Sequence, residues 1–228
     1  MAGLGRPGAR LSSWTWLVLI WALLSTALWL SQQAAGVLAQ APLFALLDWQ
    51  PGLWQTQPWR LWTAALVHWS GVHLLLNLLG CAALIAWGHA AALGRRHTLA
   101  WLLAWPLTTL LLAPSPTLLR YGGLSGVLHA GVAIGAWGLL WHCQGQRRRV
   151  GVLVLAGLAL KLLFEEPLLA QWLGLGLNVP ALPLAGAPGF AVASYAHFTG
   201  TVAGLACALA LDLVLGLLLR KQRSPALG

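Results

Sequence analysis

The sequence has 228 residues, of which 59% are hydrophobic and only 7% are charged. A soluble globular domain has about 25% charged residues, so this composition excludes an ordinary soluble protein and indicates a polytopic membrane protein. The formal net charge of +9 does not indicate nucleic-acid binding, because the basic residues stand in short clusters between apolar segments. Cys81, Cys143 and Cys207 lack the Cys-x-x-Cys spacing of metal sites and are interpreted as small core residues.

Six apolar segments follow one another along the chain. The first, Trp14 to Leu30, has a basic flank and small residues at 37–41, which are features of a secretory signal peptide. Its length and the five segments after it favour a retained spanning helix. The other expected spans are Leu61 or Val72 to Trp87, His97 to Ala113, Gly122 to Trp141, Val150 to Phe164 and Phe190 to Leu219. We therefore expect an all-α protein with six transmembrane helices.

The domain organisation follows from these segments. Residues 1–13 are expected to form an N-terminal tail, 14–220 the six-helix membrane domain, and 221–228 a C-terminal tail. Residues 31–60 are rich in Trp and Pro, which predicts a connection lying at the membrane interface. Residues 165–189 are rich in Pro and Gly and are expected to form a flexible outer loop that acts as a lid.

The basic residues indicate the orientation of the chain. Ten of the 13 Lys and Arg residues fall on one side of a six-span arrangement, in clusters at 6–10, 95–96, 147–149 and 220–223. Cytoplasmic loops carry the excess of Lys and Arg in membrane proteins. Both termini are therefore expected in the cytoplasm.

Polar side chains inside apolar spans mark candidate functional residues, because a charge at a helix centre costs about 2.5–3.5 kcal/mol on insertion. The candidates are His68, His73, Asn77, Ser125, His129, His197 and Asp212. In the six-span arrangement His73, Asn77, Ser125 and His197 come from three spans that enter from the outer side, and they share a similar depth. A nucleophile, a base and donors for an oxyanion are the groups that acyl transfer requires.

Ser125 stands in a glycine-rich run that opens an apolar helix. Gly123 and Gly126 leave the hydroxyl uncrowded and allow another helix or a substrate backbone to come close. Small residues at such spacings also serve ordinary packing between transmembrane helices, as Gly200 and Gly204 do on the last span. The run alone is compatible with both interpretations.

The other candidates have structural interpretations as well. His73 and Asn77 are four residues apart on one helix face and can bond to each other or to a neighbouring carbonyl. His197 can be a satisfied core histidine, and Asp212, near the inner end of the last span, is assigned to structure or ion pairing. His129 shares a face with the serine and is interpreted as a base, a packing partner of His197 or a metal ligand.

Three motifs in chain order resemble the rhomboid intramembrane serine proteases. They are His73-Leu-Leu-Leu-Asn77, Gly123-Leu-Ser-Gly126 and Ala196-His-Phe-Thr-Gly200. Trp59-Arg60 is similar to the Trp-Arg pair of the family's first loop, and the resemblance covers about residues 55–215. The run from Tyr121 to Ala130, with histidine in place of the common tyrosine four residues after the serine, looks like the rhombosortase branch of that family.

The resemblance implies a six-transmembrane-helix rhomboid-like bundle with serine endopeptidase activity. Ser125 would be the nucleophile and His197 its general base, in a dyad without an acid, since no Asp or Glu is expected at that depth. The backbone N–H of Ser125 and the side chains of His73 and Asn77 would hold the oxyanion. The supporting residues would be Gly123, Gly126, His129 and Gly200. No metal or other cofactor is implied.

The expected partners are the lipid bilayer and membrane-anchored proteins with a single transmembrane segment, without nucleic acid. The rhombosortase resemblance implies removal of C-terminal Gly-Gly-type sorting anchors at a bacterial inner membrane, in a site that opens to the outer side. One alternative is a catalytically silent rhomboid-like protein that binds transmembrane helices.

A second alternative is a metal or haem membrane protein. Its ligands would be His68, His73, His129 and His197. His68 and His73 are five positions apart, which on one helix turns their side chains about 140° apart. This spacing is a poor match to a shared ligand face.

Overall fold

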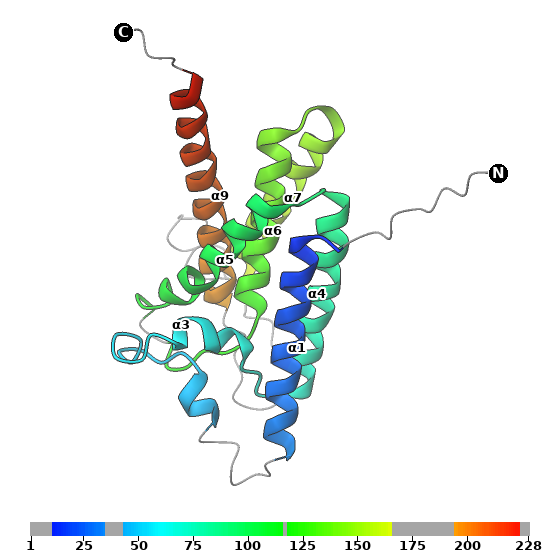
Figure 1. Ribbon diagram of the computed structural model, residues 1–228. Coiled ribbons are helices and arrows are strands. Elements are labelled where there is room, and N and C mark those ends of the chain that lie inside the picture. The colour runs from blue at the N-terminus through cyan, green and yellow to red at the C-terminus, as the bar shows by residue number, and fades with distance from the viewer. Residues whose placement is uncertain (1–10, 35–42, 116–117, 166–193, 224–228) are drawn as a thin grey trace, which may run out of the picture.

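The computed structural model describes residues 11–34, 43–115, 118–165 and 194–223. These residues fold into helices and contain no β-strand, so the expected all-α class is confirmed for them (Figure 1). The long helices are α1 (Ser13–Ala34), α4 (Gly71–Ala90), α5 (Arg95–Leu110), α6 (Ser125–His142), α7 (Gly145–Glu165) and α9 (Ser194–Arg223). Two short elements, α3 (Arg60–Thr63) and the 3-10 helix η1 (Ala64–Leu66), precede α4.

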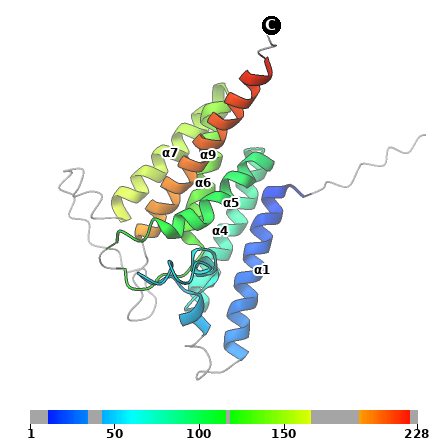
Figure 2. The same ribbon diagram turned by 60° about the vertical axis from the view of Figure 1, so that its left-hand side comes forward.

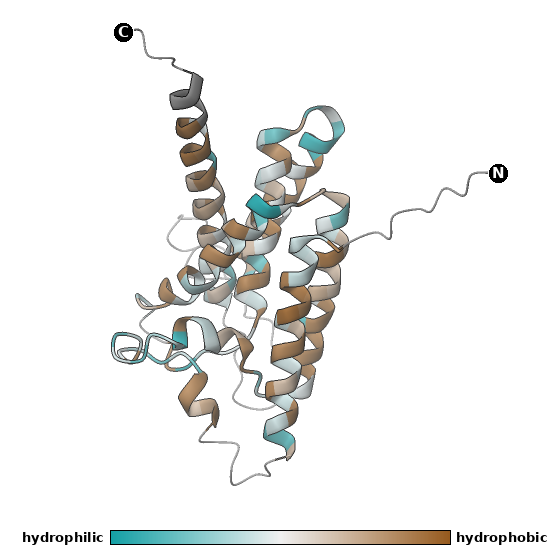
Figure 3. Cartoon of the chain, viewed as in Figure 1, coloured by the Kyte–Doolittle hydropathy of each residue, from teal (hydrophilic) through white to brown (hydrophobic). Residues whose placement is uncertain are grey.

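Three helices are long and apolar enough to cross a membrane: α1, α4 and residues Ser194–Leu218 of α9. Their outward faces carry large apolar side chains, among them Leu23, Leu79 and Leu217, each more than half exposed. Figure 3 shows this apolar colour along the length of the helices. Because apolar surface of this extent is unfavourable in water, it indicates a membrane protein.

Helix α6 lies at the centre of the fold and packs against α4, α5, α7 and α9 (Figures 1 and 2). Most of its residues are buried, and many of them are Gly or Ala. These small residues allow close approach: a Cβ at Gly200 would lie 1.9 Å from the carbonyl oxygen of Gly126, and one at Gly204 would lie 2.5 Å from that of Ala130. The expected small-residue seam of the last helix is thus confirmed, and its partner is α6.

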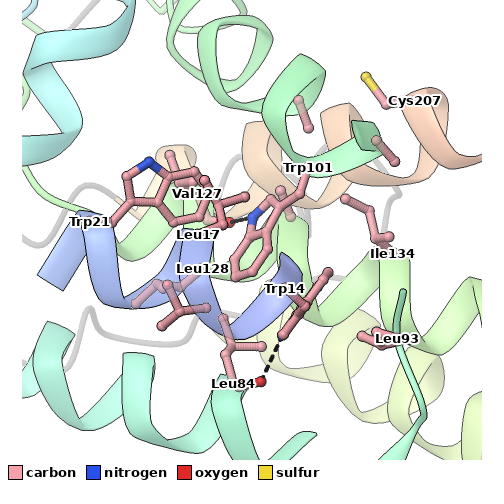
Figure 4. Close-up of a cluster of buried hydrophobic side chains, with 14 of the residues drawn as sticks. Trp14, Leu17, Trp21, Leu84, Leu93, Trp101, Val127, Leu128, Ile134 and Cys207 are labelled. Carbon is pink, nitrogen blue, oxygen red and sulfur yellow. Dashed lines mark hydrogen bonds between the residues drawn. The ribbon is translucent and has the colours of Figure 1, made fainter. Parts of the chain in front are cut away.

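Tryptophans join the first helix to the centre of the fold (Figure 4). Trp14 of α1 stacks on Trp101 of α5 at 4.1 Å between ring centroids, and Trp21 meets Trp101 edge-on at 4.7 Å. Both partners of the stacked pair have their indole N–H satisfied: Trp14 donates to the oxygen of Leu84 at 2.9 Å, and Trp101 donates to that of Val127 at 2.6 Å. Buried aromatic contacts with paired N–H groups fix α1, α4, α5 and α6 together.

The expected interfacial connection, residues 31–60, is organised around a buried carboxylate; residues 35–42 lie outside the described residues. Asp48 is fully buried and pairs with Arg60 at 3.2 Å and with Arg120 at 2.5 Å. The Arg60 guanidinium also donates to the backbone oxygen of Asp48 at 2.5 Å. A buried charge persists only when it is paired in this way, so the ion pairs hold this segment in one place.

Backbone hydrogen bonds tie the same segment to the chain just before α6. Trp49 and Tyr121 form an isolated antiparallel bridge with two N–H···O bonds of 2.9 Å. The N–H of Gly123 donates to the oxygen of Ala64 at 3.0 Å. The run that leads into Ser125 therefore rests on the segment that precedes α4.

One helix start agrees with an expected alternative, and one differs. Of the two starts expected for the second span, Leu61 is wrong and Val72 is right within one residue: α3 and η1 form separately, and α4 begins at Gly71, after Ser70, whose hydroxyl accepts from the N–H of His73 at 3.1 Å. This is an N-cap. Helix α6 begins at Ser125 and not at Gly122, because Gly123 has φ of +125°, which is incompatible with a right-handed helix.

The long helices run in different directions through the fold. In Figure 1, α9 rises to its C-terminal end at the top, whereas α1 descends from its N-terminal end toward the bottom. The N-terminal ends of α6 and α9 lie lower than their C-terminal ends, near α3 (Figures 1 and 2). The candidate residues of α6 and α9 thus lie in the N-terminal turns of these helices, which are in contact with each other.

Candidate active site

Ser125 is the first residue of α6 and is half-buried. Its N–H belongs to the first turn of the helix, where backbone donors have no partner within the helix. Tyr121 supports the turn before it by donating its hydroxyl to the oxygen of Gly123 at 2.7 Å. Burial raises the pKa of Tyr121 to about 12, against opposing hydrogen bonds with the backbone of Gly126 and the side chain of Ser125. The phenol therefore remains a donor at neutral pH.

His197 lies in the first turn of α9 and is buried. The contact between Gly200 and Gly126 brings this turn against the start of α6. His129 touches both sides of the junction: its Nδ1 donates to the oxygen of Ser125 at 2.7 Å, and its ring stacks on that of His197 at 4.0 Å and 14°. The structure thus places His129 as a packing partner of His197, one of the three interpretations that the sequence leaves open.

The expectation that no acid lies beside His197 is wrong. The Nδ1 atom of His197 is 2.8 Å from Oε2 of Glu165, the last residue of α7. Glu165 also pairs with Lys161 one turn earlier, and the Lys161 ammonium lies 3.4 Å from the same imidazole nitrogen. The sequence assigned Glu165 to a loop, whereas α7 extends far enough for its end to reach the first turn of α9. The rest of the expected lid, residues 166–189, lies outside the described residues.

His73 and Asn77 meet the turn before Ser125, as the sequence predicts. A Cβ at Gly123 would lie 2.6 Å from Nε2 of His73 and 3.6 Å from Nδ2 of Asn77, so both nitrogens lie against the backbone of this glycine. The absence of a side chain at position 123 makes this approach possible. The two side chains from α4 therefore lie next to the turn that precedes Ser125.

His68 is a site residue whose role the sequence does not reveal. It lies before α4 and not on it, so the expected 140° separation from His73 does not apply, and the two rings are 4.9 Å apart. Its Nδ1 contacts the oxygen of Leu66 at 3.0 Å, and its Nε2 contacts Nδ2 of Asn77 at 3.0 Å. A carbonyl only accepts, so Nδ1 carries the hydrogen and Nε2 accepts from Asn77.

The protonation state of His68 supports this assignment. Burial, with the nearby His73 acting in the same direction, lowers the pKa of His68 to about 4, against the hydrogen bond with Leu66. The imidazole is therefore neutral at pH 7 and can accept from Asn77. The second hydrogen of that amide goes to the oxygen of His73 at 3.2 Å. Both amide hydrogens of Asn77 are thus used within the protein, which leaves His73 as the side-chain donor that faces Gly123.

Among the described residues, His129, Glu165 and His197 place ligand atoms within 4.8 Å of one another, the spacing of a metal site. The imidazoles are stacked almost in parallel, so their in-plane lone pairs run side by side and do not converge on one ion. The Nδ1 atom of His129 is also occupied by the Ser125 oxygen. This arrangement fits packing and proton transfer better than metal ligation.

Asp212 is not part of the site. It accepts from the indole of Trp137 at 2.9 Å and contacts His142 at 3.0 Å and Arg96 at 3.7 Å. These contacts join α5, α6 and α9 toward the end of the bundle remote from Ser125. The assignment of Asp212 to structure and ion pairing is confirmed.

No family model matches the sequence, and no curated protein matches it significantly. The resemblance to rhomboid proteases stays a prediction from short motifs, and function is inferred from the geometry of the site.

Proposed function

We propose that this protein is an intramembrane serine endopeptidase of the rhomboid type, with Ser125 as nucleophile and His197 as general base. The observation that carries the proposal is the contact chain at the junction of α6 and α9. In it, His129 bonds to Ser125 and stacks on His197, while His73 lies against Gly123 beside them. Polar groups of these types, gathered from three helices, match what acyl transfer requires.

The proposal includes six spans, formed by all six long helices. Helices α5, α6 and α7 are shorter or less apolar than α1, α4 and α9, the three helices that are long and apolar enough to cross a membrane. A span enclosed by other helices needs small residues more than large apolar ones, and α6 is enclosed in this way. The basic residues that begin α5 and α7 then face the cytoplasm together with both termini.

The reaction begins when Nε2 of His197 takes the proton of the Ser125 hydroxyl as Oγ attacks the scissile carbonyl. The backbone N–H of Ser125 and Nε2–H of His73 stabilise the oxyanion. The imidazolium returns the proton to the leaving amine as the C–N bond breaks, which leaves an acyl-enzyme. His197 then removes a proton from water as the water oxygen attacks the acyl carbon, and it returns that proton to Oγ of Ser125 as the C–Oγ bond breaks and the acid is released.

We propose as substrates membrane-anchored proteins with one transmembrane segment, and specifically C-terminal Gly-Gly-type sorting anchors at a bacterial inner membrane. The support is the run from Tyr121 to Ala130, with His129 in the place of the common tyrosine. The backbone carbonyls of a helix are bonded internally and are protected from attack. Glycine lowers the cost of leaving the helix by about 1 kcal/mol per residue relative to alanine, so a Gly-Gly segment presents an accessible peptide bond.

Cleavage of a reporter with a Gly-Gly motif, one transmembrane helix and a basic tail tests the proposal. We expect the wild-type protein in vesicles to release the reporter, and Ser125→Ala to release none while inserting normally. A fluorophosphonate probe should label the wild type and not Ser125→Ala. Cleavage by Ser125→Ala at the wild-type rate would remove the serine-protease proposal, and dependence on Zn²⁺ after chelation would support the metal alternative.

A further inference from the structure

The Nδ1 atom of His197 has two neighbours that require opposite tautomers of the ring. Oε2 of Glu165 lies 2.8 Å away, and Nζ of Lys161 lies 3.4 Å away. An ionised carboxylate only accepts hydrogen bonds, whereas an ammonium only donates them. The carboxylate therefore favours a hydrogen on Nδ1, and the ammonium favours a hydrogen on Nε2.

We propose that Glu165 is a positioning residue that completes a Ser125–His197–Glu165 triad. This inference rests on the protease activity proposed above. Glu165 accepts from Nδ1–H of His197, which leaves the lone pair of Nε2 free to take the serine proton. The carboxylate stays ionised throughout, and its charge stabilises the imidazolium that forms during the attack. The proton passes from Ser125 to His197 and then to the leaving amine.

The geometry decides between the two neighbours in favour of Glu165. A distance of 2.8 Å is that of a charge-assisted hydrogen bond, and 3.4 Å is at the limit of any hydrogen bond. Lys161 precedes Glu165 by one helical turn and bonds to the same carboxylate oxygen. The ammonium thus holds the carboxylate in place and is itself satisfied there.

The charges around His197 give the two residues opposite effects on its basicity. Glu165 contributes the negative charge, and Lys161 contributes a positive one. His129 from α6 is held with a hydrogen on Nδ1 by the Ser125 oxygen, and His73 approaches from α4. Loss of the carboxylate makes the imidazolium less stable, so His197 becomes a base at lower pH. Loss of the ammonium has the reverse effect.

The pH dependence of cleavage in vesicles tests the triad. We expect Glu165→Gln to lower kcat at least about 10-fold and to move the acidic limb of the kcat/KM profile to lower pH; the loss for a fully buried acid in a triad is about 10⁴-fold. Glu165→Asp should restore part of the rate. Lys161→Met should move the acidic limb to higher pH. A purely structural ion pair predicts no movement of the limb in either variant.

Asp212→Asn is the matched control, because Asp212 also contacts a histidine, His142, at 3.0 Å, but away from Ser125. We expect it to leave the acidic limb in place. If Glu165→Gln keeps the wild-type rate and limb while Ser125→Ala is inactive, the triad is overturned and the protease stands. If Ser125→Ala is fully active, the protease itself is overturned. If Glu165→Gln unfolds in detergent, the direction in which the acidic limb moves in Lys161→Met decides between the triad and a purely structural ion pair.

Discussion

Asn77 has both hydrogens of its amide engaged within the protein, on His68 and on the oxygen of His73. His73 directs its Nε2 toward Gly123, two residues before Ser125. The two residues that share a face of α4 are therefore not equivalent. In the proposed reaction His73 is the donor to the oxyanion, and Asn77 holds the surrounding rings in position.

His73→Ala is expected to reduce kcat by about 10²–10³, the loss found when one oxyanion donor is removed, with little change in KM. Asn77→Ala should cost less, because its amide is already bound elsewhere. Single-turnover cleavage at matched protein levels measures both. A larger loss for Asn77→Ala than for His73→Ala would reverse the assignment.

The sequence predicts the polar residues of the site but not all their partners. Ser125, His73 and His197 are found because polar groups in apolar spans are rare and because their depths agree. The sequence analysis compares His68 with His73 as if both lay on one helix. The position of His68 depends on the break before Ser70, which the apolar pattern does not show. Glu165 is missed because charges at the end of a span look like loop residues. The last two spans are consecutive, so the end of one and the start of the other are expected on the same outer side, and that is the signal that would have found it.

At the scale of elements, the contact between α6 and α9 is made by backbone atoms. A Cβ at Gly200 would lie 1.9 Å from the Gly126 oxygen, and backbone cannot move aside without separating the two helices. Ser125 and His197 lie on either side of this contact. The separation of Ser125 and His197, the proposed nucleophile and base, is thus set by two glycines.

Gly200→Ala is expected to abolish cleavage and to lower the thermal unfolding midpoint in detergent. The matched control is Gly216→Ala on the same helix, where an added Cβ meets nothing within 4 Å. Alanine favours a helix over glycine by about 1 kcal/mol, so this control should be as stable as the wild type or more so. If the thermal unfolding midpoint of Gly200→Ala equals that of the wild type, the contact between α6 and α9 can relax to accommodate the added Cβ.

Helix positions are predicted within a few residues because long apolar runs bounded by charges are strong signals. The starts of α4 and α6 are shifted by local chemistry: the Ser70 hydroxyl caps one, and the positive φ of Gly123 delays the other. Neither effect can be recognised from the pattern of apolar residues. Both shifts matter, since they place His68 and Ser125.

At the scale of the whole molecule, the described residues are helical, and three helices suit a membrane. The apolar composition and the long apolar segments predict a helical membrane protein; six spans are expected, and three of the described helices are long and apolar enough to be candidates. Helix α6, with 18 residues, is shorter than these three, and its neighbours cover most of it, so Gly and Ala can replace Leu there.

Thiol labelling tests the proposed orientation. In a background with Cys81, Cys143 and Cys207 replaced by Ala, Gln55→Cys should react with a membrane-impermeant maleimide on intact cells. Gln146→Cys, an equally exposed glutamine at the start of α7, should react only after permeabilisation. The reverse pattern would place the termini outside and contradict the orientation drawn from the basic residues.

The buried carboxylate of Asp48 limits how such a protein can be rebuilt by recombination. Arg60 lies on the same segment, but Arg120 belongs to the chain that leads into Ser125. Removing Arg120 leaves the buried Asp48 carboxylate paired with Arg60; because Arg120 is half exposed, this costs less than the about 3–5 kcal/mol of breaking a fully buried pair. A chimaera that imports the segment before α4 from another protein therefore has to import the matching partner at position 120. The two stretches form one exchangeable unit, although the arginines are 60 positions apart in the sequence.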